Sequence, residues 1–476
     1  MGDICSFDQS FVSFLLLAAS GGFIALLTPC VFPLLPMTVT FFLKRNQSRG
    51  KAIFEASLYA FFIVSIYTLV GFLLTVLFGR NAANVLSTHW LPNMLFFITF
   101  IVFALSFLGL FEITLPHTWA NKTDEKAEKG GVLGIFFMAL TLVVVSFSCT
   151  GPIASTLLAG AASGCYWKPT LGMMAYSSAF ALPFALFAVF PSMLSSLPKS
   201  GNWMNTVKVS LGLIELALAF KFLSQADLAY HWDILPRNIF IAIHVAIFVV
   251  LALYLLNIVK IGYDHTHEKV GALQAVIAVA ALTMALYLIP GLFGAPLNAL
   301  SGYLPPAHYQ EFSIDNSQKE SSTQKSALCA QVKYADKLHG IAGVQGYFDY
   351  KQALQCAKEQ DKMLFIDFTG HACANCRRME ANVFTNSEIK SILNDKYVVV
   401  SLYVDDKTLL PETEWVQSTY DGELKKTIGE VNANLQIEKF NMNAQPQYII
   451  VNPKDEKPLR TIYYSSFEAF KKFLIG

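Results

Sequence analysis

Long runs of apolar residues fill about the first 300 positions of this 476-residue chain, whereas short apolar runs alternate with polar ones in the last third. A run of about 20 apolar residues is long enough to cross the hydrocarbon core of a membrane as a helix. We predict eight such helices, at residues 11–42, 53–79, 91–115, 132–160, 170–197, 205–224, 237–259 and 270–292. The pattern therefore predicts a polytopic α-helical membrane domain over residues 11–300.

The composition agrees with this pattern. Hydrophobic residues make up 54% of the chain and charged residues 14%, whereas soluble domains are about a quarter charged. The net charge is +1, and the absence of a basic stripe argues against nucleic-acid binding. Residues 1–10 form a short polar tail without the basic start of a signal peptide, so we expect the first apolar run to remain as a membrane helix.

The pattern changes after the last apolar run. Residues 301–340 are polar and predict a linker, with a helix at 326–338, and residues 341–476 predict a soluble α/β domain. Its expected helices are 349–360, 386–395, 424–439 and 466–474, and its expected strands are 363–368, 397–404, 447–452 and 458–464. This order resembles that of thioredoxin-like domains. An insertion at 405–422 is longer than a minimal loop requires.

A Cys-x-x-Cys motif, Cys373 to Cys376, lies between the strand 363–368 and a helical run. This context is typical of redox motifs. The free N–H groups and partial positive charge at a helix start favour a thiolate at Cys373, and Cys376 can then resolve a mixed disulfide. A structural zinc site is the alternative, but it needs two further ligands, and His371 is the sole histidine nearby.

Two other residues fit this redox motif. Asp367 lies inside the apolar strand, where burial should raise the pKa of its carboxyl and let it take the proton of Cys376. Pro446 directly precedes the strand 447–452. It resembles the proline that faces the dithiol in thioredoxin-like domains, and that resemblance implies a cis peptide bond.

Two predicted membrane helices contain a cysteine flanked by proline. Cys30 lies between Pro29 and Pro33, and Cys149 lies three residues before Pro152. Proline removes backbone hydrogen bonds, so we expect both helices to kink or break, with the broken backbone lining a cavity. The matching places in helices 1 and 4 indicate an inverted repeat with a site near the midplane. We predict a redox pair, against the alternative of two small packing residues.

Four other cysteines lack such a context and have no nearby partner thiol in the sequence. Cysteines buried without activating neighbours are inert. We therefore predict no redox role for Cys5, Cys165, Cys329 and Cys356.

Basic residues in the predicted loops indicate the orientation. They are concentrated after helices 1, 3, 5 and 7, at Lys44, Arg45, Arg49, Lys51, Lys122, Lys126, Lys129, Lys199, Lys208, Lys260 and Lys269. Cytoplasmic loops carry the excess of Lys and Arg. Both termini and the Cys373 domain are therefore expected outside, which in a bacterium is the periplasm.

These motifs resemble a known family. Thr28-Pro29-Cys30-Val31-Phe32-Pro33 and Ser148-Cys149 resemble the DsbD and CcdA family of transmembrane thiol electron carriers. The C-terminal part is similar to the periplasmic thioredoxin-like domain of DsbD, through residues 365–370 and Cys373-Ala-Asn-Cys376. Typical DsbD has a further N-terminal periplasmic domain with its own cysteine pair, and we expect this chain to lack it.

The resemblance implies a bacterial inner-membrane protein-disulfide reductase. Cytoplasmic thioredoxin would reduce Cys30–Cys149, this pair would reduce Cys373–Cys376, and periplasmic thiol-disulfide proteins would accept the electrons, in cytochrome c biogenesis or related pathways. The electrons would come ultimately from NADPH, with no cofactor or metal bound to this chain.

Two alternatives stay open. The chain could transport a small solute or metal and use the outer domain as a sensor, although our helix bounds place Glu215 and the other acidic residues nearer helix ends than a coupling site would be. The chain could also act in the reverse direction, as an oxidant.

Overall fold

The fold is described from a computed structural model, at residues 9–26, 28, 31, 49–78, 87–111, 131–158, 167–189, 202–262, 270–310 and 328–476. Contacts divide the chain into two compact units. The first unit comprises residues 1–87, 94–219 and 247–282, and the second comprises 88–93, 220–246 and 283–476. Each unit is described by itself below.

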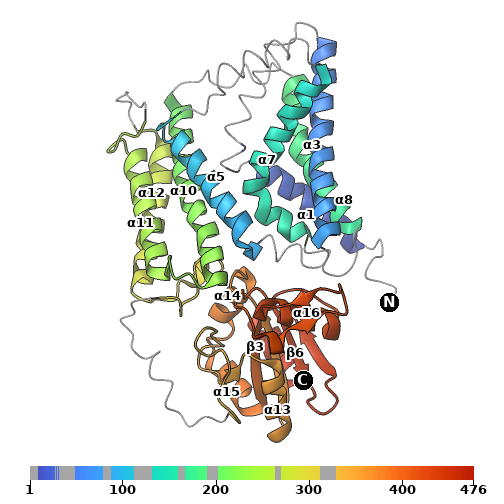
Figure 1. The fold of residues 1–476 in the computed structure, drawn as a ribbon. Coiled ribbons are helices and arrows are strands. Elements are labelled where there is room, and N and C mark those ends of the chain that lie inside the picture. Colours follow the sequence, from blue (N-terminus) through green and yellow to red (C-terminus); the bar gives the residue numbers. More distant parts are fainter. Residues whose placement is uncertain are drawn as a thin grey trace. The chain divides into compact units, whose positions relative to one another are not determined.

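Each of the eight predicted apolar ranges overlaps one long helix (Figure 1). The helices are α1 (Gln9–Ala25), α3 (Arg49–Phe78), α5 (Trp90–Phe107), α7 (Gly131–Leu158), α8 (Trp167–Val189), α10 (Asn202–Tyr230), α11 (Arg237–Leu255) and α12 (Ala272–Leu292). Four of them hold a stretch long and apolar enough to cross a membrane, namely Ile53–Leu73, Trp90–Phe107, Arg237–Leu255 and Ala272–Leu292. The chain is thus a helical membrane protein, and eight crossings stay a prediction.

The first helix is shorter than predicted. Helix α1 ends at Ala25, and the described residues that follow it, Leu26, Thr28 and Val31, are not helical. The Thr28 hydroxyl donates to the Ala25 carbonyl over 2.6 Å, and the Val31 N–H donates to the Thr28 carbonyl over 3.1 Å. A break in the first helix was expected from its prolines, and the chain does leave the helix just before Pro29 and Cys30.

Helix α7 behaves differently from α1. It is one continuous helix from Gly131 to Leu158 and includes Cys149 and Pro152. A break of the fourth predicted helix at this proline is therefore wrong, whereas a kink there stays a prediction. A proline removes one N–H from the backbone ladder, and the neighbouring bonds can maintain the helix. Helices α8 and α12 likewise continue through Pro183 and Pro290.

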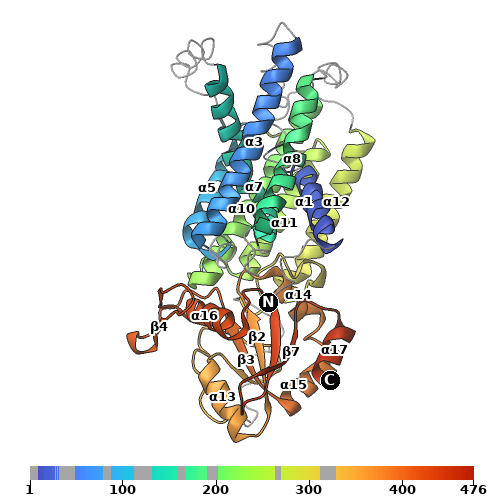
Figure 2. The same cartoon turned by 90° about the vertical axis from the view of Figure 1, so that its right-hand side faces the viewer.

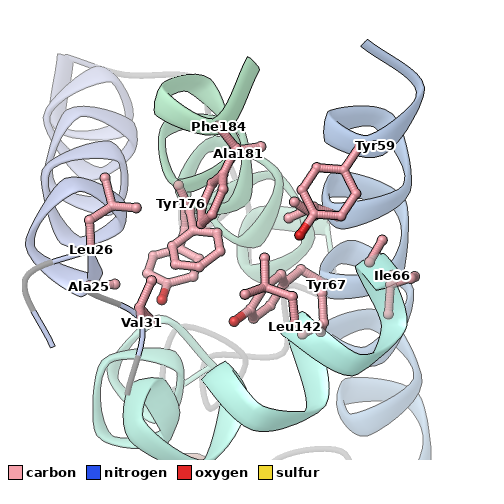
Figure 3. Close-up of a cluster of buried hydrophobic side chains, with 14 of the residues drawn as sticks. Ala25, Leu26, Val31, Tyr59, Ile66, Tyr67, Leu142, Tyr176, Ala181 and Phe184 are labelled. Carbon is pink, nitrogen blue, oxygen red and sulfur yellow. The ribbon is translucent and has the colours of Figure 1, made fainter. Parts of the chain in front are cut away.

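Helices α1, α3, α7 and α8 share a buried aromatic cluster (Figure 3). The rings of Tyr67 and Tyr176 meet edge to face at 5.8 Å, a favourable aromatic geometry. A side chain at Gly22 would come within 2.3 Å of the Tyr176 carbonyl oxygen, so this glycine allows α1 to approach α8 closely. Val31, the residue after Cys30, is fully buried in the same cluster. The chain beside Cys30 is therefore anchored in the helical core.

The second unit contains a five-stranded mixed sheet. Its strands are β1 (Gly346–Tyr347), β2 (Met363–Thr369), β3 (Tyr397–Tyr403), β6 (Gln447–Val451) and β7 (Pro458–Ile462), in the order β1-β3-β2-β6-β7. Strands β1, β3 and β2 are parallel, and β6 and β7 are antiparallel to their neighbours. The hairpin β4 (Val416–Gln417) and β5 (Leu424–Lys425) lies in the insertion. This is the predicted thioredoxin-like architecture, and the fold class is confirmed.

Helices cover both faces of this sheet (Figure 2). They are α13 (Tyr350–Glu359), α14 (Ala374–Asn382), α15 (Ser387–Lys396), α16 (Ile428–Phe440) and α17 (Phe467–Ile475). Successive side chains of a strand point to opposite faces. Leu364, Ile366 and Phe368 enter the core with α13 and α16, whereas Phe365 enters the core with α14, α15 and α17. The alternation therefore places Asp367 on the α14 face.

One described part of the predicted linker, residues 328–338, belongs physically to the soluble domain. Residues 328–338 contain turns and no helix, so the expected helix there is wrong as far as the structure describes it. Leu338 is buried with Phe348 and Tyr403. Apolar burial stabilises this segment without a helix. The domain boundaries at 300 and 340 stay predictions.

Candidate active site

Cys373 and Cys376 form a disulfide between β2 and α14. Cys373 is the N-cap residue of α14, and its sulfur accepts the Cys376 N–H at 3.1 Å. Cys376 is only 2% exposed, whereas Cys373 is partly exposed. After reduction, the helix N-terminus would stabilise a thiolate at Cys373. The geometry therefore makes Cys373 the attacking or attacked sulfur and Cys376 the protected, resolving one.

Asp367 is buried on the α14 side of the sheet. Its Oδ2 accepts a hydrogen bond from the Ser401 hydroxyl at 3.4 Å, and no donor among the described residues reaches its Oδ1. Burial, reinforced by the negative charge of Glu380, raises the pKa of the Asp367 carboxyl to about 7. A carboxyl that titrates near neutrality beside a redox helix can exchange protons. Among the described residues, no hydrogen bond joins Asp367 to Cys376, so its role as the proton acceptor stays a prediction.

An arginine that we did not single out lies directly after Cys376. Arg377 is buried, and its guanidinium donates to the Thr369 hydroxyl at 3.3 Å and to the Gly370 carbonyl at 3.4 Å. It also forms a 2.8 Å ion pair with Glu380 on the next turn of α14. Buried arginine charges are retained only when paired and hydrogen-bonded. Arg377 therefore ties α14 to the end of β2 and places a positive charge beside the cysteines.

A second overlooked residue, Asp405, holds the loop before Cys373. Its carboxylate accepts the backbone N–H groups of His371 at 2.9 Å and of Ala372 at 3.0 Å. A Cβ atom at Gly370 would come within 2.7 Å of Asp405 Oδ2, so only glycine allows this approach. The carboxyl ends of the parallel strands β2 and β3 meet at one sheet edge. The acidic pair after β3 was the sequence signal for this contact.

Pro446 lies at the same sheet edge. The peptide bond between Gln445 and Pro446 is cis. In the antiparallel register Phe368 faces Gln447, so Pro446 is level with Thr369, at the start of the loop that leads to Cys373. Pro446 is buried. Its position is that of the proline beside the dithiol which the resemblance implies.

Among the described residues, His231, His371 and Asp406 form one group whose donor atoms lie close enough to hold a metal ion. The Nε2 atoms of His231 and His371 lie 2.7 Å and 3.0 Å from the same oxygen, Asp406 Oδ2. A tetrahedral zinc ion with bonds of about 2.0–2.1 Å needs donor atoms about 3.3 Å apart. These shorter separations are hydrogen-bond distances. The arrangement therefore fits a carboxylate that accepts two imidazole N–H groups better than a metal centre.

The described residues do not include the side chains of the two membrane cysteines, Cys30 and Cys149. Cys30, Pro29 and Pro33 lie outside the described residues. Cys149 and Pro152 lie in α7, where only their backbone is described. A Cys30–Cys149 pair and a cavity shaped by these prolines therefore stay predictions. Cys5 and Cys165 also lie outside the described residues.

Cys329 and Cys356, which have no partner thiol nearby in the sequence, are each other's partners in the structure, and the absence of a redox role for them stays a prediction. They form a disulfide across a separation of 27 residues. Cys356 is buried on α13 and Cys329 is exposed. The Gln360 amide lies 3.4 Å from both sulfurs. No spacing motif marks such a pair, since the two residues meet only when residues 328–338 fold onto the domain.

One acidic residue of the membrane region also differs from expectation. Glu215 lies in the middle of α10 (Asn202–Tyr230) and is fully buried, and it is equally central in the predicted range 205–224. The sequence argument against a transporter placed Glu215 nearer a helix end. That argument no longer holds for this residue.

Comparisons with known proteins agree with the two-part architecture. Residues 11–226 match the family model described as the cytochrome c biogenesis protein transmembrane domain, and residues 345–453 match a thioredoxin-like model. The thiol:disulfide interchange protein DsbD of Pseudoalteromonas atlantica is 24% identical over 401 residues, 83% of this chain and 60% of that protein. DsbD of Vibrio cholerae is 26% identical over 77% of this chain and 54% of its own length.

A further DsbD, from Haemophilus ducreyi, is 31% identical over 230 residues, which are 47% of this chain and 39% of that protein. The chain thus spans about three fifths or less of the length of these relatives. Fold and site together define a helical membrane protein that carries a thioredoxin-like domain with a vicinal cysteine pair. In both of its parts the chain is similar to the DsbD proteins.

Proposed function

We propose that this protein is a protein-disulfide reductase that carries reducing equivalents across the bacterial inner membrane by successive thiol–disulfide exchange. The observation that carries the proposal is the Cys373–Cys376 pair at the N-terminus of α14, in a chain whose other half is helical and membrane-spanning. In this proposal both termini and the thioredoxin-like domain are periplasmic, as the loop charges predict.

The proposed relay has three exchanges. Reduced cytoplasmic thioredoxin attacks a Cys30–Cys149 disulfide, a mixed disulfide forms, and its second thiol releases oxidised thioredoxin and the membrane dithiol. The membrane dithiol reduces Cys373–Cys376 in the same way, and Cys373 then attacks the disulfide of a periplasmic protein. Each exchange breaks one disulfide and forms another, and moves two electrons and two protons. NADPH would supply the electrons through thioredoxin, and no cofactor need bind this chain.

The energetics allow this direction. Thioredoxin has a potential of about −270 mV and strongly oxidising periplasmic partners about −120 mV. For two electrons this difference is worth about 7 kcal/mol. The relay therefore needs no ion gradient. Periplasmic acceptors could serve cytochrome c maturation or disulfide isomerisation, which the chemistry of Cys373 does not distinguish.

The thioredoxin-like site supplies the proton chemistry of this proposal. When an incoming thiolate attacks the disulfide, Cys376 leaves as a thiolate and must be protonated, and in the reverse step it must lose that proton. The Asp367 carboxyl, with a pKa of about 7, would donate and accept it. Arg377 and the helix N-terminus would favour the thiolate of Cys373.

Replacement of Cys30 tests the relay. In cells that make Cys30→Ser, Cys373 and Cys376 should accumulate as the disulfide, measured by trapping free thiols with an alkylating reagent. Cys5→Ser is the matched control, for which we expect the wild-type redox state. If Cys373 and Cys376 remain reduced in Cys30→Ser, the electron-carrier proposal fails. In cells without cytoplasmic thioredoxin, loss of reduction would support a reductant, and persistence of reduction an oxidant.

A solute transporter is the second candidate, because Glu215 is buried in the middle of α10. Ionisable residues inside membrane helices often line ion or substrate pathways. A transporter should lose uptake in Glu215→Gln while Cys373–Cys376 remains reducible. An electron carrier should retain function in that variant unless Glu215 also handles a proton of the relay.

A further inference from the structure

The turn between α10 and α11 is held rigidly within the second compact unit. The Asp227 carboxylate accepts the N–H groups of Ile234 and Leu235, both at 3.0 Å, and the Tyr309 hydroxyl at 2.7 Å. Two of these hydrogen bonds fix the backbone of the turn, and the third ties the turn to the segment after α12. His231, the first residue after α10, is therefore presented in a defined direction.

The residue that His231 meets, Asp406, is connected to the redox loop. Asp406 is fully buried, and its Oδ1 accepts the Thr408 N–H at 2.8 Å. Its Oδ2 accepts a hydrogen bond from Nε2 of His371, and His371 lies two residues before Cys373. The His371 ring also lies against Tyr403, with ring centroids 4.4 Å apart. A shift of Asp406 would therefore be passed to the loop that carries Cys373.

The contact between the two segments is direct. His231 Nε2 lies 2.7 Å from Asp406 Oδ2, and the Lys407 N–H donates to the Ala229 carbonyl at 3.1 Å. Burial alone would raise the pKa of the Asp406 carboxyl, but hydrogen bonds from His231 and His371 outweigh it and lower that pKa well below its usual range. The hydrogen bond to Asp406 correspondingly raises the pKa of His231. An ionised acceptor makes this a charge-assisted hydrogen bond.

A second contact brings the same unit to the redox helix itself. Gly302, in the segment after α12, is so close to α14 that a Cβ atom there would lie 3.2 Å from the Ala374 carbonyl oxygen and 2.9 Å from Arg378 Nε. Ala374 is the residue after Cys373. The segments that follow α10 and α12 thus both contact the face of the domain that carries the dithiol.

We propose that His231 is a positioning residue for the reduction of Cys373–Cys376: its hydrogen bond to Asp406 holds the redox loop against the turn between α10 and α11. This inference rests on the proposed function, in which that disulfide receives electrons from the membrane pair. His231 does not touch the reacting sulfurs. It raises the fraction of time in which the thioredoxin-like domain is correctly placed to be reduced.

The test uses the full chain in lipid vesicles, with reduced thioredoxin on the donor side and quenching of free thiols by alkylation. We expect His231→Ala to slow the reduction of Cys373–Cys376 by about tenfold, because it removes a hydrogen bond to an ionised group. His231→Gln retains an N–H donor at nearly the same reach and should restore most of the rate. Ile234→Ala, which removes an exposed side chain from the same turn, is the matched control and should equal wild type.

Two further measurements separate positioning from other roles. The redox potential of Cys373–Cys376 in the full chain, equilibrated with glutathione, should be unchanged in His231→Ala. A shift in that potential would mean that His231 tunes the thiols and would overturn the inference. His231→Ala should also add little to the defect of Asp406→Asn, because both remove the same bond. Additive defects would contradict the proposed pairing.

The outcomes are distinguishable from failure of the proposed function. If Cys30→Ser does not block reduction of Cys373–Cys376, the relay itself is wrong. If Cys30→Ser blocks this reduction, but Cys373–Cys376 is reduced at the wild-type rate in His231→Ala, the relay stands and the positioning role of His231 is refuted.

Discussion

The thioredoxin-like domain holds two disulfides whose surroundings differ. Cys373–Cys376 lies at a helix N-terminus, beside buried Arg377 and a carboxyl of raised pKa, Asp367. Cys329–Cys356 joins an exposed turn to the middle of α13, and the described polar group nearest its sulfurs is the neutral Gln360 amide. The same covalent bond is thus placed in an activating environment at one end of the domain and in an inert one at the other.

The difference shows what makes a cysteine pair reactive. Exchange requires a sulfur that can be reached and a thiolate that is stabilised as it forms. The first pair has both, since Cys373 is partly exposed and caps α14. The second pair instead closes a loop of 27 residues, which restricts the unfolded chain. We therefore assign chemistry to Cys373–Cys376 and stability to Cys329–Cys356.

The largest expected effect comes from removal of the resolving cysteine. Cys376→Ala should abolish turnover and trap the partner protein on Cys373 as a mixed disulfide, because no second thiol remains to release it. The trapped protein, identified by mass spectrometry after non-reducing electrophoresis, is the donor or acceptor. Cys329→Ser/Cys356→Ser is the control and should retain turnover. An equal loss of turnover in both variants would contradict the assignment of the redox chemistry to Cys373–Cys376 alone.

The next effect is on stability. In the chain-entropy model, closing a loop of 27 residues stabilises the domain by about 3.5 kcal/mol. Cys329→Ser/Cys356→Ser should therefore lower the free energy of unfolding of the domain by roughly this amount, measured by urea unfolding of the full chain in detergent. Faster proteolysis near residue 330 should accompany it. An unchanged unfolding midpoint would mean that apolar contacts such as those of Leu338 hold the segment unaided.

The smallest of the three effects tests whether Asp367 accepts the proton of Cys376. Because burial raises the pKa of this carboxyl to about 7, its basic form is populated only as the pH rises through that value. Resolution of a mixed disulfide by Cys376 should therefore accelerate with pH across this range. Asp367→Asn should lose this rise and be slower by about a hundredfold at alkaline pH, with the two rates converging in acid.

Stopped-flow measurement of thiol release gives these rates. Ser401→Ala is the matched control, since it removes the 3.4 Å hydrogen bond to Asp367 and leaves the carboxyl in place. This control should retain the pH dependence. A pH profile in Asp367→Asn that matches wild type would assign the proton to another group.

Much of the fold could be predicted because its helices and strands are encoded by patterns among residues that are close together in the sequence. The long apolar runs indicated the helices, and the short apolar run 363–368 predicted the central strand, which the structure shows as Met363–Thr369. The Cys-x-x-Cys motif between strand and helix predicted a site from adjacent residues alone. Cys373, Cys376 and Asp367 all lie within ten positions of one another, so local structure places them together.

Other parts depend on contacts between distant segments. The sequence by itself determined the two-part architecture and the redox motif, since periodicity and spacing encode them locally. Only the tertiary structure decided that Cys329 meets Cys356, that Asp405 holds the loop before Cys373, and that His231 reaches Asp406 across a separation of 175 residues. The reason is physical: these contacts form only after apolar burial has brought the segments together, and no local pattern of residues records which pairs will meet.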